Sequence, residues 1–335
     1  MAHLSPPDIN SLKEGLLAGN RASLSQAITL CESSLRLHQE LSLNMLEELL
    51  PHGGKSIRIG VSGIPGAGKS TFIEALGMEL IEKHQKKVAV LAIDPTSEQS
   101  GGSILGDKTR MDDLSRNHNA FIRPTATSTQ LGGVGQYTQA AIILCEAAGF
   151  DVVIVETVGV GQSEISVNKM VDVFLLLQIV GAGDDLQSMK RGILECVDLL
   201  VINKADGELK QKAQLEAANL KKALHLFPQK HLGWSRQVKT CSSIEKKGIT
   251  DIWNAIEEHE QYLKSSGKFE VQRKQQTKAW FVDLQNNCLF DFIQTQPSVQ
   301  ALLIKTRAEL SSTNSNPLGL VREMKIALRE LFFRK

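Results

Sequence analysis

Aromatic side chains and excess charge are both scarce in this sequence. Tyr, Trp and Phe together make up 5% of the 335 residues, and 38 Lys and Arg balance 37 Asp and Glu, for a formal net charge of +1. A chain with so little net charge has no global field that would attract nucleic acid or an anionic membrane. We therefore expect no nucleic-acid partner, and any phosphate binding must depend on a local site.

Cysteine pairs and long apolar runs are also missing. The five cysteines lie 45 or more residues apart and include no CxxC pair, which favours reduced thiols inside the cell. The amino terminus lacks the basic and apolar regions of a signal peptide. The most apolar stretch, residues 170–183, contains Asp172 and Gln178 and is too short to span a bilayer. We expect a soluble cytoplasmic protein with no membrane partner.

Short β-branched and apolar runs alternate with helical patterns from Ile57 onward. The runs expected to form strands are residues 57–61, 88–93, 152–155, 173–179 and 199–202. Continuous apolar runs of this length, separated by helices, are typical of a parallel sheet that is covered on both faces. The pattern predicts a doubly wound α/β fold, with a mainly parallel sheet flanked by helices, in a domain at residues 53–256.

Helical patterns flank this domain on both sides. Residues 1–52 carry apolar side chains at helical spacing in three stretches, of which the second covers about residues 22–37. Residues 257–278 are charged and Gln-rich, and we interpret them as a solvated helix face or linker. The pattern is helical again from 280 to 331. We expect an N-terminal helical extension at 1–52 and a C-terminal helical one at 257–335.

A glycine-rich loop follows the first predicted strand. Its sequence, GIPGAGKST, fits the pattern G-x-x-x-x-G-K-[ST] and precedes a helical run at residues 72–83. The glycines let backbone N–H groups turn toward phosphates, and the amino terminus of the helix adds positive partial charge. Lys69 would reach the β- and γ-phosphates, and the Ser70 hydroxyl would bind Mg²⁺. The predicted phosphate-binding residues are Gly63, Ile64, Pro65, Gly66, Ala67, Gly68, Lys69, Ser70 and Thr71.

An N-K-x-D element follows the last predicted strand and indicates which base is bound. The Asp206 carboxylate can accept from N1–H and N2–H₂ of guanine, whereas adenine would leave it unpaired. We expect Asn203 to brace the loop and meet N7, and the Lys204 stem to lie over the ring. The residues expected to supply a backbone N–H to guanine O6 are Ser242, Ser243 and Ile244. The sequence thus favours GTP over ATP.

Acidic residues near strand ends and in glycine-rich loops are candidates for the metal site. Asp94, Asp107 and Glu156 stand at such positions. Mg²⁺ takes hard oxygen ligands, usually one or two carboxylates together with phosphate oxygens and water. Ser70 with some subset of the three carboxylates can fill that shell. The eight histidines show no paired ligand spacing, so we expect surface or core roles for them.

The residues after Glu156 are typical of a nucleotide-sensing switch. Glu156-Thr-Val-Gly159 resembles the D-x-x-G element of GTPases with Glu in place of Asp, and we expect switch loops around residues 96–110 and 157–168. Hydrolysis needs in-line water and stabilised charge. Gln162 or a carboxylate can place the water, and the sequence does not decide between them. The predicted catalytic residues are Lys69, Asp107, Glu156 and Gln162, with Lys108 or Arg110 as further sources of charge.

Together these motifs resemble one family, the MeaB/ArgK/MMAA-type GTPases that accompany adenosylcobalamin-dependent acyl-CoA mutases. The similarity covers most of the chain, from about Arg21 to the helical tail. Matches at 101–111 and 156–164 are far more specific than a P-loop alone. The segments that carry the resemblance are 63–71, 94–95, 101–111, 121–124, 131–134, 156–164, 181–187 with Lys190, and 203–206.

The resemblance implies a dimerising P-loop GTPase of the SIMIBI-like class that holds Mg²⁺ through Ser70, Asp94, Asp107 and Glu156. Family members act as chaperones that gate cofactor loading into the mutase and protect or restore it. By the same resemblance, residues 181–192 form an additional switch that faces the mutase. Residues 257–335, around Trp280, correspond to a helical dimerisation arm.

Three other functions fit parts of the sequence. A metal-insertion GTPase, such as a nickel chaperone, would share the fold, but the chain has no His- or Cys-rich tract. An ATP-dependent kinase linked to amino-acid transport would share the P-loop, but residues 203–206 favour guanine over adenine. A purely structural nucleotide-binding module would have no need of the two switch-like loops.

Overall fold

The computed structural model of the chain describes residues 8–94, 111–126, 135–157, 163–181, 191–224, 227–311 and 316–333. The chain forms two compact units, Met1–Trp280 and Phe281–Lys335, and the long helix α13 (Lys268–Thr295) contributes to both. Among the described residues, no helix is long and apolar enough to cross a membrane.

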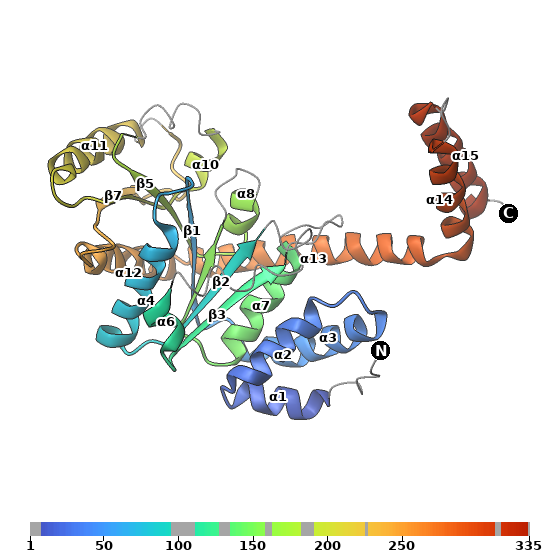
Figure 1. Cartoon of the computed structure of the whole chain (residues 1–335), viewed down its shortest axis with the longest axis horizontal. Coiled ribbons are helices and arrows are strands. Elements are labelled where there is room, and N and C mark those ends of the chain that lie inside the picture. Colours follow the sequence, from blue (N-terminus) through green and yellow to red (C-terminus); the bar gives the residue numbers. More distant parts are fainter. Residues whose placement is uncertain are drawn as a thin grey trace. The chain divides into compact units, whose positions relative to one another are not determined.

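The first unit is built around a seven-stranded parallel sheet with strand order β3-β2-β4-β1-β5-β6-β7 (Figure 1). From the central strand β1, the order runs outward through β4 on one side and through β5 on the other. This reversal is the topological switch point, where α/β folds place their ligands. The strands are β1 Ile57–Gly63, β2 Val88–Asp94, β3 Ala120–Ala126, β4 Val152–Glu156, β5 Val173–Ile179, β6 Leu199–Asn203 and β7 Gln237–Thr240.

Helices cover both faces of this sheet. They are α1 Ile9–Leu17, α2 Arg21–Cys31, α3 Arg36–Leu49, the 3₁₀ turn η1 Leu50–His52, α4 Lys69–His84, α6 Asp112–Arg116, α7 Gly135–Ala147, α8 Ser163–Asn168, α10 Arg191–Cys196, α11 Leu209–Leu224 and α12 Ile249–Ser265. Strand side chains alternate between two cores. Val153 and Val155 pack with α7 and the N-terminal helices, whereas Val152 and Ile154 pack with α4 and α12. The predicted α/β fold with a parallel sheet is confirmed.

Two strands and one helix boundary differ from the sequence prediction. The edge strands β3 and β7 carry polar residues and were not predicted. Pro124, which lacks an N–H, is tolerated in β3 because that strand lies at the edge of the sheet. The second N-terminal helix ends at Cys31 instead of continuing to 37, and Leu35 lies 60% exposed between α2 and α3. There the Ser33 hydroxyl accepts from the Leu35 N–H and so replaces helical hydrogen bonding.

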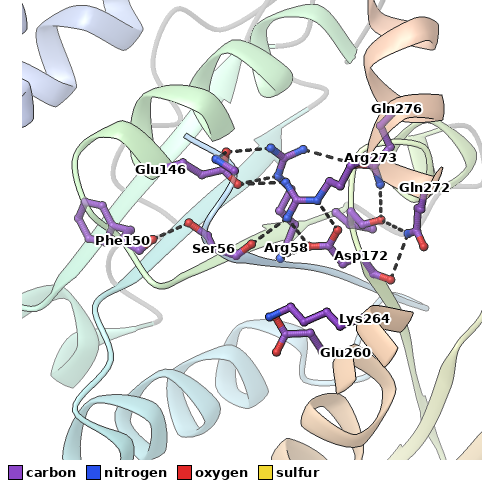
Figure 2. A network of polar contacts seen from close by, with 12 residues as sticks. Ser56, Arg58, Glu146, Phe150, Asp172, Glu260, Lys264, Gln272, Arg273 and Gln276 are labelled. Atoms are coloured by element: carbon purple, nitrogen blue, oxygen red, sulfur yellow. Dashed lines mark hydrogen bonds and ion pairs between the residues drawn. The ribbon is translucent and has the colours of Figure 1, made fainter. Parts of the chain in front are cut away.

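The interpretation of residues 257–278 as a solvated face or linker is wrong for the side chains that face the sheet. In α12, His259 and Leu263 are buried. In α13, the Arg273 guanidinium contacts the Asp172 carboxylate at 2.7 Å and the Glu146 carboxylate at 3.3 Å (Figure 2). These acidic partners lie more than 100 residues earlier in the chain. The local sequence therefore cannot show that the charge of Arg273 is compensated.

The contacts of α13 fasten its first turns to the starting ends of β1 and β5. Arg58 of β1 donates two hydrogen bonds of 2.8 Å to Glu146, and the Gln276 amide donates to the Val171 carbonyl, also at 2.8 Å (Figure 2). Burial alone would raise the pKa of Glu146, but the hydrogen bonds and positive charges of Arg58 and Arg273 outweigh it and lower that pKa. The charged network is thus an internal connection between α7, the sheet and α13.

The second unit consists of the end of α13 together with α14 (Pro297–Leu310) and α15 (Pro317–Phe333). The predicted helical tail is therefore present. Val299 is buried, whereas many other apolar side chains of these helices are exposed.

Candidate functional site

The carboxyl edge of the sheet gathers the described parts of the predicted nucleotide site. The glycine-rich loop leaves β1, Glu156 ends β4, Asn203 ends β6, and residues 241–244 follow β7. Because all seven strands are parallel, their carboxyl ends meet at this one edge. The fold thus assembles residues that lie as much as 181 positions apart in the sequence, from Gly63 to Ile244.

The path of the P-loop depends on its glycines at two points. A Cβ on Gly63 would lie 2.3 Å from the Leu177 carbonyl oxygen of β5, so the loop leaves the sheet with no room for a side chain. Gly68 has φ +84°, a left-handed conformation, and immediately precedes α4, which begins at Lys69. The free N–H groups of the first turn of α4 point out of its amino terminus, where anions bind.

Lys69 is folded back over its own loop. Its Nζ donates to the Gly63 carbonyl at 2.8 Å and to the Ile64 carbonyl at 3.3 Å. Burial lowers the pKa of Lys69, while the negative charges of Glu156 and Glu164 act in the opposite direction. The ammonium group therefore lies against carbonyl oxygens of its own loop and within the influence of two carboxylates.

Ser70 and Glu156 form the part of the predicted metal site that the structure describes. The Ser70 hydroxyl donates to Glu156 Oε1 at 3.2 Å. In the sheet register Ala92 pairs with Glu156, so Asp94, two residues further along β2, reaches the same edge. The side chain of Asp94 and all of Asp107 lie outside the described residues. A hydroxyl and a carboxylate oxygen this close together are a donor set that fits Mg²⁺.

Asn203 joins the P-loop to the loop after β7. Its Nδ2 donates to the Ala67 carbonyl at 2.9 Å, and its Oδ1 accepts from the Ser243 N–H at 3.1 Å and from the Ser243 hydroxyl at 2.8 Å. Asn203, Ala67 and Ser243 are all buried. Asn203 thus connects the P-loop to the loop after β7.

The Asp206 side chain is held by its neighbour across the loop. The Ser242 hydroxyl donates to Asp206 Oδ2 at 2.7 Å, and the Ala205 N–H donates to the Cys241 carbonyl at 2.9 Å. Lys204 has φ +59°, and its Cε lies 4.0 Å from the point that a Cβ on Gly68 would occupy. The stem of Lys204 therefore lies beside the P-loop. The predicted contact residue Ile244 is 78% exposed at the tip of this loop.

One residue of the site was not singled out by the sequence reasoning. Glu164, at the start of α8, is buried, and its charge acts on Lys69. Its only sequence signal is its place at the end of the 156–164 motif. Three further candidates, Gln162, Lys108 and Arg110, lie outside the described residues.

A strand, a GKST loop and a helix at the switch point of a parallel sheet define a P-loop nucleoside triphosphatase. Comparison with known proteins gives its family: residues 24–298 match the family described as "Methylmalonyl Co-A mutase-associated GTPase MeaB". The chain therefore belongs to the MeaB family, and it is a GTPase that binds GTP and GDP.

Individual relatives agree with this membership. GTPase ArgK of Escherichia coli strain K12 is 52% identical over 265 residues, which are 79% of this chain and 80% of that protein. The Mus musculus protein "Methylmalonic aciduria type A homolog, mitochondrial" is 43% identical over 302 residues, 87% of this chain and 72% of that protein. A crystal structure of "LAO/AO transport system kinase" has a TM-score of 0.74 and 36% identity, and covers 98% of this chain and 100% of its own.

Proposed function

We propose that this GTPase acts with Mg²⁺ as a chaperone for an adenosylcobalamin-dependent acyl-CoA mutase, most simply methylmalonyl-CoA mutase. It would gate loading of the cofactor and protect or reactivate the mutase. The observation that carries the catalytic part is the 3.2 Å contact between Ser70 and Glu156, which joins the P-loop to the end of β4. The partner is inferred from the family to which residues 24–298 belong.

In the proposed reaction, water attacks the γ-phosphorus, the bond to the β–γ bridging oxygen breaks, and GDP and phosphate leave. Lys69 exchanges its contacts with the Gly63 and Ile64 carbonyls for the β- and γ-phosphate oxygens. Mg²⁺, when bound, neutralises charge on those oxygens. Ser70 and Glu156 would hold it, with Asp94 and Asp107 as further ligands. Gln162 or a carboxylate would place the water.

Guanine recognition is assigned to the loop after β6 and the loop after β7. Asp206 would accept from N1–H and N2–H₂ of the base, and Ser242 fixes the Asp206 carboxylate through the 2.7 Å hydrogen bond. The backbone of Ser242, Ser243 and Ile244 would meet O6. Because Asn203 contacts the P-loop and Ser243 at once, phosphate and base binding are mechanically linked.

The C-terminal unit is proposed to form a homodimer. Its helices expose large apolar side chains, including Phe281, Phe292 and Leu318, at 62%, 61% and 80%. Contiguous exposed apolar surface on a globular protein marks an interaction site. A second copy of the chain would bury it, in line with the dimerisation arm of the family that the sequence resembles.

The decisive experiment measures GTP turnover and cofactor loading with and without the mutase. We expect the full-length protein to hydrolyse GTP slowly alone, because no arginine finger is evident in the sequence, and at least about 10-fold faster with mutase and adenosylcobalamin. Ser70→Ala is the control that should abolish the response to nucleotide. If the mutase changed neither the GTPase rate nor its own loading with cofactor, the chaperone proposal would be wrong.

A further inference from the structure

Three potential metal ligands come together at the opposite edge of the sheet from the nucleotide site. Asp198 immediately precedes β6, His231 lies between α11 and β7, and His259 lies on α12. Asp198 Oδ1 is 3.7 Å from His231 Nε2 and 3.6 Å from His259 Nε2. One ligand atom from each of the three residues lies within 4.8 Å of the other two. The GTPase mechanism uses none of these side chains.

The polar atoms with which these three side chains face one another are buried and lack hydrogen-bond partners among the described residues. Asp198 is 2% exposed and His259 is 1% exposed. Among the described residues, Asp198 Oδ1 and both Nε2 atoms have no hydrogen-bond partner. Unpaired polar atoms are costly in the interior, and separations of 3.6 and 3.7 Å are too long for direct hydrogen bonds. They are close to the roughly 3.4 Å between ligand atoms about 2.1 Å from a tetrahedral ion.

The other contacts of Asp198 leave Oδ1 directed at the imidazoles. Lys230 Nζ contacts Oδ2 at 2.6 Å, and the Phe174 N–H donates to Oδ2 at 2.9 Å. Lys230 also donates to the Asn168 side chain and the Cys196 carbonyl, which fixes the ammonium group on the Oδ2 side. An ion at Oδ1 would therefore share the carboxylate with Lys230, and the two cations would bind different oxygens.

The cluster offers two imidazoles and one carboxylate as ligands. Burial lowers the pKa of His259 to about 4 and also lowers that of His231, although Asp198 acts in the opposite direction on both. Two neutral imidazoles and one carboxylate are a donor set that suits zinc and similar transition ions better than Mg²⁺ or Ca²⁺.

We propose that Asp198, His231 and His259 bind a divalent transition-metal ion of the zinc class, with water as a further ligand. The ion would tie the segment before β7 to α12 and to the start of β6. This role is structural, and it is independent of the mutase partner and of the nucleotide chemistry.

The test uses the full-length protein, stripped with a chelator and dialysed against Zn²⁺, with metal content measured by mass spectrometry. We expect one Zn²⁺ per chain more than in the His231→Gln/His259→Gln variant, together with a higher melting temperature that EDTA reverses. His118→Gln changes an exposed histidine and should retain the ion. Ser70→Ala should also retain it, which separates this site from the nucleotide site.

A second variant guards against loss of folding, because His259 is fully buried. His231→Gln alone removes a half-buried ligand, and we expect Zn²⁺ affinity to fall by about 10-fold or more in a chelator competition. Co²⁺ should give the visible absorption of a four-coordinate site, and this absorption should disappear in the same variant. Equal Zn²⁺ binding by wild type and His231→Gln, or a melting temperature that responds to neither Zn²⁺ nor EDTA, would overturn the proposal.

Discussion

The Asp206 carboxylate is oriented by the Ser242 hydroxyl, which donates to its Oδ2 at 2.7 Å. Asp206→Asn replaces an acceptor with a donor at the proposed partner of guanine N2–H₂. Xanthine carries an oxygen at that ring position, so the variant should favour xanthosine triphosphate. We expect the ratio of kcat/KM for the two nucleotides to shift by on the order of 100-fold or more. Competition between GTP and xanthosine triphosphate measures it directly.

The controls for Asp206→Asn separate base recognition from general damage. Asp251→Asn changes an exposed aspartate at the start of α12 and should leave the preference for GTP unchanged. Ser242→Ala should weaken GTP binding but keep the preference, because the carboxylate remains. If Asp206→Asn still preferred GTP, guanine recognition would have to be assigned to other residues.

The sequence alone identified site residues that belong to contiguous motifs. It did not identify residues that only folding brings together. The P-loop and the N-K-x-D element are short, and each position has its own chemical reason, so they were found directly. Glu164 carries no such local signal, and neither does the cluster of Asp198, His231 and His259. The two histidines are 28 positions apart, so nothing in their spacing indicated that they meet on one carboxylate.

The junction between α7, the sheet and α13 depends on Glu146. Its carboxylate pairs with Arg58 at 2.8 Å and with Arg273 at 3.3 Å, and its side chain is 1% exposed. Glu146→Gln would leave two buried guanidinium groups partly uncompensated. We expect it to lower the free energy of unfolding by roughly 3 kcal/mol, measured by urea denaturation at pH 7. Glu260→Gln is the matched control, since it breaks only the partly exposed pair with Lys264 and should cost about 0.5 kcal/mol or less (Figure 2).

The lowered pKa of Glu146 predicts that the free energy of unfolding depends on pH. Because the pKa of Glu146 is lower in the folded protein than the value of about 4.3 in an unfolded chain, its stabilising contribution is present above about pH 4.3. It is lost as the pH falls through the folded-state pKa. Wild type should therefore lose stability below about pH 4 more steeply than Glu146→Gln. Parallel slopes, or a variant as stable as Glu260→Gln, would show that the network does not stabilise the junction.

Elements were predicted well where burial on both faces leaves a continuous apolar run. The five inner strands satisfy this condition, whereas β3 and β7 lie at the edges and mix polar with apolar residues. The prediction for the polar run at residues 257–278 was wrong for the converse reason. The charge of Arg273 within it is matched by Asp172 and Glu146 in the folded chain, and local composition cannot distinguish a charge that is solvated from one that is compensated.

Across the whole chain, the nucleotide chemistry is confined to the first unit, and the second unit offers apolar surface. On the last turns of α13, Phe281, Leu289 and Phe292 are between 55% and 62% exposed. Apolar residues of this part of α13 recur at helical spacing, at 281, 288 and 292 and again at 282, 289 and 293. Their side chains therefore form a stripe along the helix. A stripe of this kind is the pattern by which helices associate.

Phe292→Glu should therefore separate the proposed dimer. At micromolar concentration we expect wild type to sediment at twice the 36.7 kDa chain mass and the variant at 36.7 kDa, because a carboxylate cannot be buried in an apolar interface without a partner. Gln294→Glu adds the same charge on the opposite side of the same helix and should leave the dimer intact. A wild-type protein that sediments as a monomer at all accessible concentrations would contradict the proposal, and so would a Phe292→Glu variant that remains a dimer. In either case the exposed stripe would have to be assigned to the mutase instead of a second copy of this chain.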